Sequence, residues 1–341
     1  MHLFGNPPRP ARALTANTLA CAALVAIAVP IAQGASKPAP AKSERASAPT
    51  KSPSSSRAKS NRAPAPTKSP SSAKSKHAPA AGAAPKANRP YLVGTFNMAG
   101  GLGGRGDRVD TAEALTRSIN DRGADIVFLQ EACSRMTNQL AGMLGSGWTV
   151  RFLDTAGARC KGSGGSAYGI GIVARTSRLR FKGDYTARLP LDAFERRGMV
   201  CLDLAGSRPI FACSTHLTAD PGVARDVSRR RQTEAITRNV LRWTSAGQAI
   251  IVGGDFNATP MSWALDPLWH KGYGGTASGS FVEVDSGPSQ EIPGAYRRDI
   301  GQATFGAQKF DYIFVRDMSV GSAVVGNSNV SDHEPLWATV Y

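Results

Sequence analysis

Residues 249–257 read Ala-Ile-Ile-Val-Gly-Gly-Asp-Phe-Asn, and this stretch decides how the rest of the chain is interpreted. Its apolar start has the length and the β-branched composition of a buried strand. An acid and an amide, Asp255 and Asn257, follow this run directly. The stretch therefore predicts a buried β-strand that presents polar side chains at its end.

Polar residues also lie beside five other apolar runs of the same kind, and we call each such position, including 255–257, a corner. Asn97, Glu131 and His216 each follow a run, Asp311 opens the run Asp-Tyr-Ile-Phe-Val, and Asp332-His333 precede the closing run 336–340. One polar residue at a strand end is usually a turn residue or a satisfied hydrogen-bonding group. Residues 90–341 contain only three histidines, however, and two belong to this pattern, whereas His270 does not. We therefore expect the six corners to meet at one rim of the fold.

The residue types at these corners suit metal-assisted hydrolysis of a phosphate ester. Glu131, Asp332 and the amide oxygen of Asn97 are hard oxygen ligands, which suit Mg²⁺ and also Mn²⁺. Two histidines are able to serve as acid and base on opposite sides of a phosphorus atom. A carboxylate such as Asp255 is able to hold or deprotonate the attacking water.

Strand patterns outnumber helical patterns in residues 90–341. Helical spacing predicts a helix over 107–122, with Val109, Ala112, Leu115 and Ile119 inward, and another over 222–244, with Val223, Val227, Ile236, Val240 and Leu241 inward. Strand candidates are 91–96, 125–130, 148–152, 168–174, 179–186, 199–204, 210–215, 249–253, 310–315, 321–325 and 336–340. So many strands with so few helices predict an α/β (α+β) four-layer sandwich, in which two mixed β-sheets pack face to face with helices outside. They do not fit a doubly wound parallel sheet.

The net charge of +16 comes mainly from outside this predicted domain. Residues 36–89 are almost entirely Ala, Pro, Ser, Lys and Arg, with 12 basic residues and one acid, Glu44. When these and the two arginines of residues 1–35 are subtracted, residues 90–341 hold 27 basic and 24 acidic residues, a net charge of +3. We expect 36–89 to be a disordered linker, because it has too little apolar surface to fold. Such a basic tail is either a soluble stalk or a tether to an anionic polymer or membrane surface.

Residues 1–35 have the organisation of a secretory signal peptide. Two arginines precede an uncharged apolar run over 19–32, which ends at the small residues around Gln33. We therefore expect a secreted, extracellular protein, with cell-surface association through the tail as an alternative. We also expect the protein to be a monomer.

Cysteine usage agrees with export. Four cysteines remain once Cys21 is removed with the signal peptide. A three-residue loop over 206–208 would set residue 201 opposite 213 in a hairpin, which predicts the disulfide Cys201–Cys213 and, by elimination, Cys133–Cys160. No close Cys pair or Cys/His cluster has zinc spacing.

At the six corners the sequence resembles the endonuclease/exonuclease/phosphatase superfamily, which includes pancreatic deoxyribonuclease, neutral sphingomyelinases and inositol polyphosphate phosphatases. The matching stretches are Thr-Phe-Asn at 95–97, Leu-Gln-Glu at 129–131, Ser-Thr-His-Leu at 214–217, Gly-Gly-Asp-Phe-Asn at 253–257, Phe-Asp-Tyr-Ile-Phe at 310–314 and Ser-Asp-His at 331–333. They span nearly all of residues 91–341, so the resemblance implies the sandwich fold and a catalytic domain over 90–341.

The resemblance also implies roles for the corner residues. Glu131 would be the principal metal ligand, assisted by Asn97 and Asp332. His333, oriented by Asp311, would act on one side of the phosphorus and His216 on the other, while Asp255 and Asn257 hold the nucleophilic water and a phosphate oxygen. Arg197 matches a phosphate-binding arginine of nuclease members, with a solvated surface charge as the alternative.

One position departs from the family's pattern. Tyr168 matches the substrate tyrosine of the pancreatic nuclease, but Ile170 stands where that enzyme has a glutamate paired with its first catalytic histidine. His216 must therefore find another partner or act mainly as a hydrogen-bond donor to phosphate.

Three functions remain open from the sequence. The first is a secreted Mg²⁺-dependent endonuclease acting on DNA or RNA, motivated by export, the basic tail and the arginines at 229–231, which are equally the solvated face of a helix. The second is a hydrolase of lipid phosphoesters, like a sphingomyelinase or a phosphoinositide phosphatase; Trp263 and Trp269 are poor candidates for the membrane-binding aromatics this requires. The third, a binding module with a vestigial site, is disfavoured because all six corners are intact.

Overall fold

The computed structural model describes residues 89–101, 104–157, 159–162, 165–191, 196–288 and 296–341. The predicted signal peptide and the predicted linker up to residue 88 lie outside these residues. No helix in the described part of the chain is both long and apolar enough to cross a bilayer.

Two six-stranded mixed sheets form the centre of the domain. The first has the order β13-β14-β1-β2-β4-β3 and consists of β1 (Tyr91–Asn97), β2 (Ile126–Cys133), β3 (Trp148–Asp154), β4 (Tyr168–Arg175), β13 (Val320–Val325) and β14 (Leu336–Val340). The second has the order β5-β6-β7-β8-β12-β9 and consists of β5 (Arg180–Arg188), β6 (Gly198–Ala205), β7 (Ile210–His216), β8 (Ala249–Asp255), β9 (Val282–Glu283) and β12 (Asp311–Arg316). A small ribbon pairs β10 (Gly287–Pro288) with β11 (Tyr296–Arg297). In each sheet one pair is parallel, β1 with β2 and β7 with β8.

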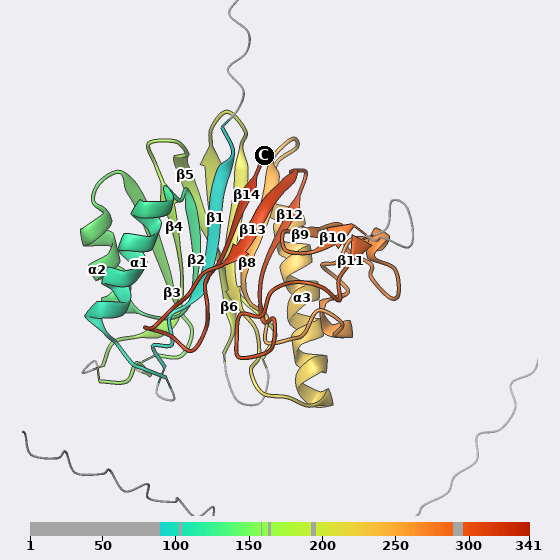
Figure 1. Ribbon diagram of the computed structural model, residues 1–341, viewed down its shortest axis with the longest axis horizontal. Helices are drawn as coiled ribbons and strands as arrows, with labels where there is room; N and C mark the ends of the chain where they lie inside the picture. Colours follow the sequence, from blue (N-terminus) through green and yellow to red (C-terminus); the bar gives the residue numbers. More distant parts are fainter. Residues whose placement is uncertain (1–88, 102–103, 158, 163–164, 192–195, 289–295) are drawn as a thin grey trace, which may run out of the picture. The chain divides into compact units, whose positions relative to one another are not determined.

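Helices cover the outer face of each sheet, which confirms the predicted four-layer sandwich (Figure 1). Helices α1 (Val109–Arg122) and α2 (Ser134–Leu144) pack on the first sheet, and α3 (Val223–Trp243) packs on the second. Between the sheets lies a core of mainly aliphatic side chains, which also includes Tyr91 and Phe128. Two short 3₁₀ turns, η1 (Trp263–Leu265) and η2 (Lys271–Tyr273), follow β8.

The two glycines before Asp255 fit positions that admit no side chain. A Cβ on Gly253 would lie 2.0 Å from Cδ2 of Phe128, which belongs to the facing sheet, and a Cβ on Gly254 would lie 2.1 Å from the carbonyl oxygen of Thr215 on β7. Close contact with the facing sheet on one side and with the neighbouring strand on the other therefore explains the double glycine.

The cysteine prediction is confirmed by strand register. Cys201 and Cys213 are direct partners in the β6–β7 pair and are joined by a disulfide across a Cα–Cα distance of 4.0 Å. Cys133 and Cys160 form the second disulfide, which links the end of β2 to the loop before β4.

Some helix predictions were wrong in detail. Val109, Val223 and Leu241 were expected inward, but they are exposed, because the buried stripes of α1 and α3 are built partly from polar residues. Arg229 is buried on α3, so it is not part of the solvated helix face that was one alternative for residues 229–231. Helix α2 was not predicted; the residues that it buries are Met136, Thr137 and Leu140.

Candidate active site

Strand register in the second sheet brings three predicted site residues side by side. His216 ends β7, Asp255 ends β8 and Asp311 begins β12, and Asp255 is the direct register partner of both. The antiparallel direction of β12 explains why its acid lies at the start of the strand, whereas the others lie at strand ends. All three side chains are buried.

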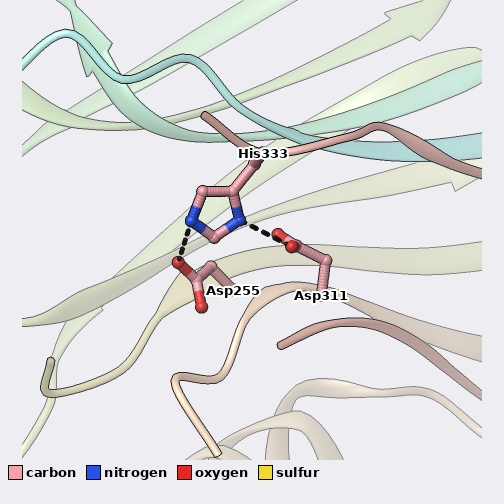
Figure 2. Close-up of side chains that lie close together, drawn as sticks. All are labelled: Asp255, Asp311 and His333. Atoms are coloured by element: carbon pink, nitrogen blue, oxygen red, sulfur yellow. Dashed lines mark hydrogen bonds and ion pairs between the residues drawn. The ribbon is translucent and has the colours of Figure 1, made fainter. Parts of the chain in front are cut away.

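His333 approaches this row from the loop between β13 and β14 of the other sheet, and Figure 2 shows its imidazole between two carboxylates. Its Nδ1 lies 2.7 Å from Oδ2 of Asp311, and its Nε2 lies 3.7 Å from Oδ2 of Asp255. The ring of Phe305 packs against the imidazole at a centroid distance of 4.6 Å. Asp311 and Phe305 therefore fix the orientation of the ring, so that Nε2 faces Asp255.

Burial and charge together perturb the pKa values of this cluster. Burial opposes ionisation of His333, but the neighbouring carboxylates, Asp311 first among them, raise its pKa to about 9. Burial raises the pKa of Asp311 against the opposing effect of His333. Burial alone would also raise the pKa of Asp255, but His216 and His333 hold it below its ordinary value. At neutral pH the Asp311–His333 pair therefore retains a proton while Asp255 is an anion.

Asp255 is held by groups from both sheets. Nδ2 of Asn97, at the end of β1, donates to Oδ2 of Asp255 at 3.0 Å and to Oε1 of Glu131 at 3.3 Å. The backbone N–H of Asn257 donates to Oδ1 of Asp255 at 2.8 Å. Asp255 thus receives donors on both oxygens, which fixes its position and stabilises its charged form.

Glu131 and Asn257 share an uncommon backbone conformation. Each has a φ of +48°, in the left-handed region that few residues other than glycine adopt. At Glu131 this coincides with a register shift in the β2–β4 pair between Leu129 and Ala132. Such local irregularities redirect side chains at the ends of strands and occur often at functional sites.

A cavity of about 800 Å³ opens over this cluster. Among the predicted site residues, its lining includes Glu131, Asp255, Asn257, Asp332 and His333. Asp332 is exposed, and the buried Asn97, His216 and Asp311 are not among the lining residues. The six corners therefore lie together: five of their residues line the cavity, and the other three, Asn97, His216 and Asp311, are buried beside them.

His216 has partners that take the place of the missing glutamate. Its Nε2 lies 3.0 Å from Nδ2 of Asn257 and 3.4 Å from Oδ2 of Asp255. Ile170, where the pancreatic enzyme carries the glutamate, is part of the apolar core between the sheets.

Arg197 and Tyr168 lie at the same end of the sheets, outside the cavity lining. Arg197 directly precedes β6, whose first residue, Gly198, is the register partner of His216. It is 3% exposed, which contradicts the alternative of a solvated surface charge. Tyr168 is buried at the start of β4, and its ring and the Glu131 carboxylate lie on the same side of Gly101, at 3.1 and 3.3 Å from a Cβ built there.

The donors at the cavity suit a hard divalent cation. Glu131, Asp255 and Asp332 contribute three carboxylates, and the single Arg or Lys among the described lining residues, Arg229, is bonded to Asp226. Asp255 is paired with His216 and His333, whereas Glu131 and Asp332 form no ion pair with a Lys or Arg in the described part of the chain. Such carboxylate oxygens are the ligands that Mg²⁺ prefers. Asn97 turns its amide nitrogen toward the carboxylates and its oxygen toward the N–H of Ala99, so its amide would have to rotate to offer oxygen to a metal.

Two hydroxyl groups that the sequence did not reveal support the cluster. Oγ of Ser331 donates to the carbonyl of Asn97 at 2.7 Å and accepts from the backbone N–H of His333. Oγ1 of Thr304 accepts from the N–H groups of Phe310 and Asp311. Ser331 lies in a recognised stretch, whereas Thr304 carries no local signal. His270, which was left out of the pattern, accepts a hydrogen bond from Gly272 in a turn.

Comparison with known proteins agrees with this geometry. The model of the Endonuclease/Exonuclease/phosphatase family matches residues 94–333, which include all six corners. No curated protein matches the chain.

Solved structures share the fold at low sequence identity. A Bacteroides vulgatus endonuclease/exonuclease/phosphatase is 18% identical, with a TM-score of 0.56 over 74% of this chain and 99% of that one. The human Nocturnin catalytic domain with bound sulfate is 19% identical, with a TM-score of 0.59 over 74% of this chain and 93% of that one. D. rerio TDP2 complexed with single strand DNA product is 15% identical, with a TM-score of 0.54 over 74% of this chain and 100% of that one.

Proposed function

Because the chain belongs to the endonuclease/exonuclease/phosphatase family, whose members are phosphoric ester hydrolases, we propose that it is a secreted Mg²⁺-dependent phosphodiesterase that hydrolyses nucleic acid, with DNA as the first candidate. The observation that carries the proposal is the convergence of Glu131, Asp255, Asp332 and His333 on one cavity. In-line hydrolysis of a phosphate ester needs acidic residues that bind the metal ion, a carboxylate that binds the attacking water, and a hydrogen-bond donor to the phosphoryl oxygens.

His333 would serve as a donor to the phosphoryl group or the leaving oxygen. Its Nδ1 is bonded to Asp311, which leaves Nε2 as the nitrogen available on the cavity side. A histidine fixed in this way loses little freedom when substrate binds, which favours catalysis.

Asp255 would orient the attacking water and accept its proton. The carboxylate has one oxygen bonded to Asn97 and the other to the N–H of Asn257, and it still lines the cavity. Asn257, which lines the cavity, would hold a phosphate oxygen on the other side of the phosphorus. His216, which contacts Asn257, and the buried Arg197 and Tyr168 would support this position from outside the cavity lining.

Glu131 and Asp332, assisted by Asn97, would hold Mg²⁺ or Mn²⁺. When bound, the cation supplies positive charge that offsets the charge developing on the phosphoryl oxygens. The supporting observation is that Glu131 and Asp332 line the cavity and form no ion pair with a Lys or Arg in the described part of the chain.

Nucleic acid as the substrate is supported by two observations. A single strand DNA product is bound to the D. rerio TDP2 structure, which has the same fold. The basic residues 36–89 would also concentrate a polyanion near the domain without sequence preference.

The test is a substrate panel with the purified protein and Mg²⁺. Plasmid DNA, RNA, sphingomyelin and phosphoinositide vesicles are compared for the wild type, His333→Ala, and a protein lacking residues 36–89. We expect nucleic-acid cleavage that needs both Mg²⁺ and His333 and that survives loss of the tail. Faster turnover of either lipid would contradict the proposal, and so would plasmid nicking that His333→Ala retains.

We also propose export and a tethering role for the basic segment. Two disulfides, Cys133–Cys160 and Cys201–Cys213, support an oxidising compartment. Fractionation of the source cells, with thiol labelling of the secreted protein, tests the location, and sedimentation of the full chain with anionic polymer or vesicles tests the tether.

A further inference from the structure

The cavity extends from the reacting centre to a wall that none of the roles above uses. This wall is formed by the segment after β8 and the residues before α3. It carries Met261 and Trp263, which are 60% and 39% exposed, while Phe305 lines the cavity beside His333 and is 37% exposed. Large apolar side chains exposed in a cavity next to a reaction centre indicate a binding surface.

Side chains of helix α3 hold this wall in place by donating hydrogen bonds to backbone carbonyls of the wall. The guanidinium of Arg230 lies 5.4 Å from the Trp263 ring centroid, and its Nη1 donates to the carbonyl of Trp263 at 3.0 Å. The hydroxyl of Thr233 donates to the carbonyl of the next residue, Ala264, at 2.7 Å. Trp263 is therefore held in place before any ligand arrives, which lowers the entropy cost of binding.

The charge of the cavity determines which part of a nucleotide this wall is able to receive. Two acids lie at this wall, Asp220 before α3 and Asp226 in its first turn, and Arg229 is the single Arg or Lys among the described lining residues. Arg229 lines the cavity, but its Nη1 donates to the carbonyls of Thr218 and Asp220 and its Nη2 to Asp226. A second phosphate would meet two carboxylates here and an arginine whose guanidinium is already bonded to protein oxygens, whereas an uncharged ring would meet Trp263 and Met261.

We propose that Trp263, with Met261 beside it, forms the binding surface for the base of the nucleotide next to the scissile phosphate. This inference rests on the proposed phosphodiesterase function. The base stacks on the indole while the sugar–phosphate chain leaves the cavity, so one phosphate at a time occupies the reacting centre. A base inside an intact duplex has both faces covered by its neighbours, so the substrate class is an unpaired nucleotide at an end, a loop or a single strand.

Three chromogenic diesters with a common p-nitrophenolate leaving group test this surface in the full chain with Mg²⁺. They carry a methyl group, thymidine through its 5′ oxygen, or choline on the other side of the phosphate. The variants are Trp263→Ala, Trp263→Phe and, as a control, Val223→Ala, which removes an exposed apolar side chain outside the cavity lining. Melting temperatures are measured for every variant.

We expect the wild type to prefer the thymidine diester over the methyl diester by about tenfold in kcat/KM, as stacking of one base predicts. Trp263→Ala should remove this preference and leave the methyl diester within twofold, while Trp263→Phe retains most of it and Val223→Ala changes neither. An equal loss on both diesters in Trp263→Ala would overturn the inference, and so would a Trp263-dependent preference for the choline diester alone. Failure of the wild type to hydrolyse any diester faster than His333→Ala would overturn the proposed function itself, and the inference with it.

Discussion

Nδ1 of His333 and Oδ2 of Asp311 lie 2.7 Å apart and join the two sheets of the sandwich at the candidate active site. His333 precedes β14 in the first sheet, and Asp311 begins β12 in the second. The geometry of the reacting centre therefore depends on how the sheets are packed on one another.

Asp311→Asn should lower kcat by about 10²-fold, because the imidazole loses its charged partner but keeps a partner of the same shape. Kinetics with bis-p-nitrophenyl phosphate measure this effect. Since Asp311 acts through His333, the double variant with His333→Ala should be no slower than His333→Ala alone. Additive losses would show that Asp311 has a separate role.

Glu131→Gln should abolish turnover at Mg²⁺ concentrations that saturate the wild type, because a neutral amide is a weaker ligand for a hard cation. A Mg²⁺ titration by calorimetry should show binding weakened by at least about tenfold. Glu113→Gln is the matched control, since Glu113 is an exposed residue of α1 that forms an ion pair with Arg117 one turn along the helix. Equal Mg²⁺ affinity in both variants would remove Glu131 from the metal site.

Gly254→Ala should destabilise the domain by several kcal/mol, because its Cβ would lie 2.1 Å from the Thr215 carbonyl oxygen and force β7 and β8 apart. Gly142→Ala should instead stabilise it by about 1 kcal/mol, because Gly142 lies inside α2 with no atom within 4 Å of the added Cβ. Urea denaturation of the two variants gives both values. Similar changes in the two variants would contradict the contact that Gly254 makes.

Glu283→Gln should make stability less dependent on pH. Burial raises the pKa of Glu283 to about 7, although Lys309 lies 3.3 Å from its carboxylate. The folded protein therefore binds more protons than the unfolded chain between about pH 4.5 and 7, and its unfolding free energy falls as pH rises through that window. A pKa shift of this size corresponds to about 3 kcal/mol of unfolding free energy. The wild type should lose this amount as the pH rises through that window, whereas Glu283→Gln should not.

Denaturant titrations from pH 4 to 8 compare the two proteins, with Glu113→Gln again as the control. Parallel curves for wild type and Glu283→Gln would show that Glu283 ionises at its ordinary pKa.

Much of the fold and of the site was predictable from local sequence. Apolar runs marked most of the central strands, and the polar residues beside them marked the corners, because strand period and burial are local properties of the chain. The spacing of Cys201 and Cys213 across a short loop was enough to predict their register. The exposed Val223 and the buried Arg229 were missed, because the face a long helix buries depends on what packs against it.

The sequence by itself determined which residues are candidates for the chemistry, namely the acids, amides and histidines beside the strands, and it placed two glycines directly before Asp255. Only the tertiary structure decided their partners. It placed Asp311 beside Asp255, gave His216 a contact with Asn257 in place of the missing glutamate, and set Trp263 on a cavity wall where Arg229 is bonded to Asp226. The physical reason is that these contacts join residues far apart in the chain, and strand register and sheet packing, which fix them, are properties of the whole core.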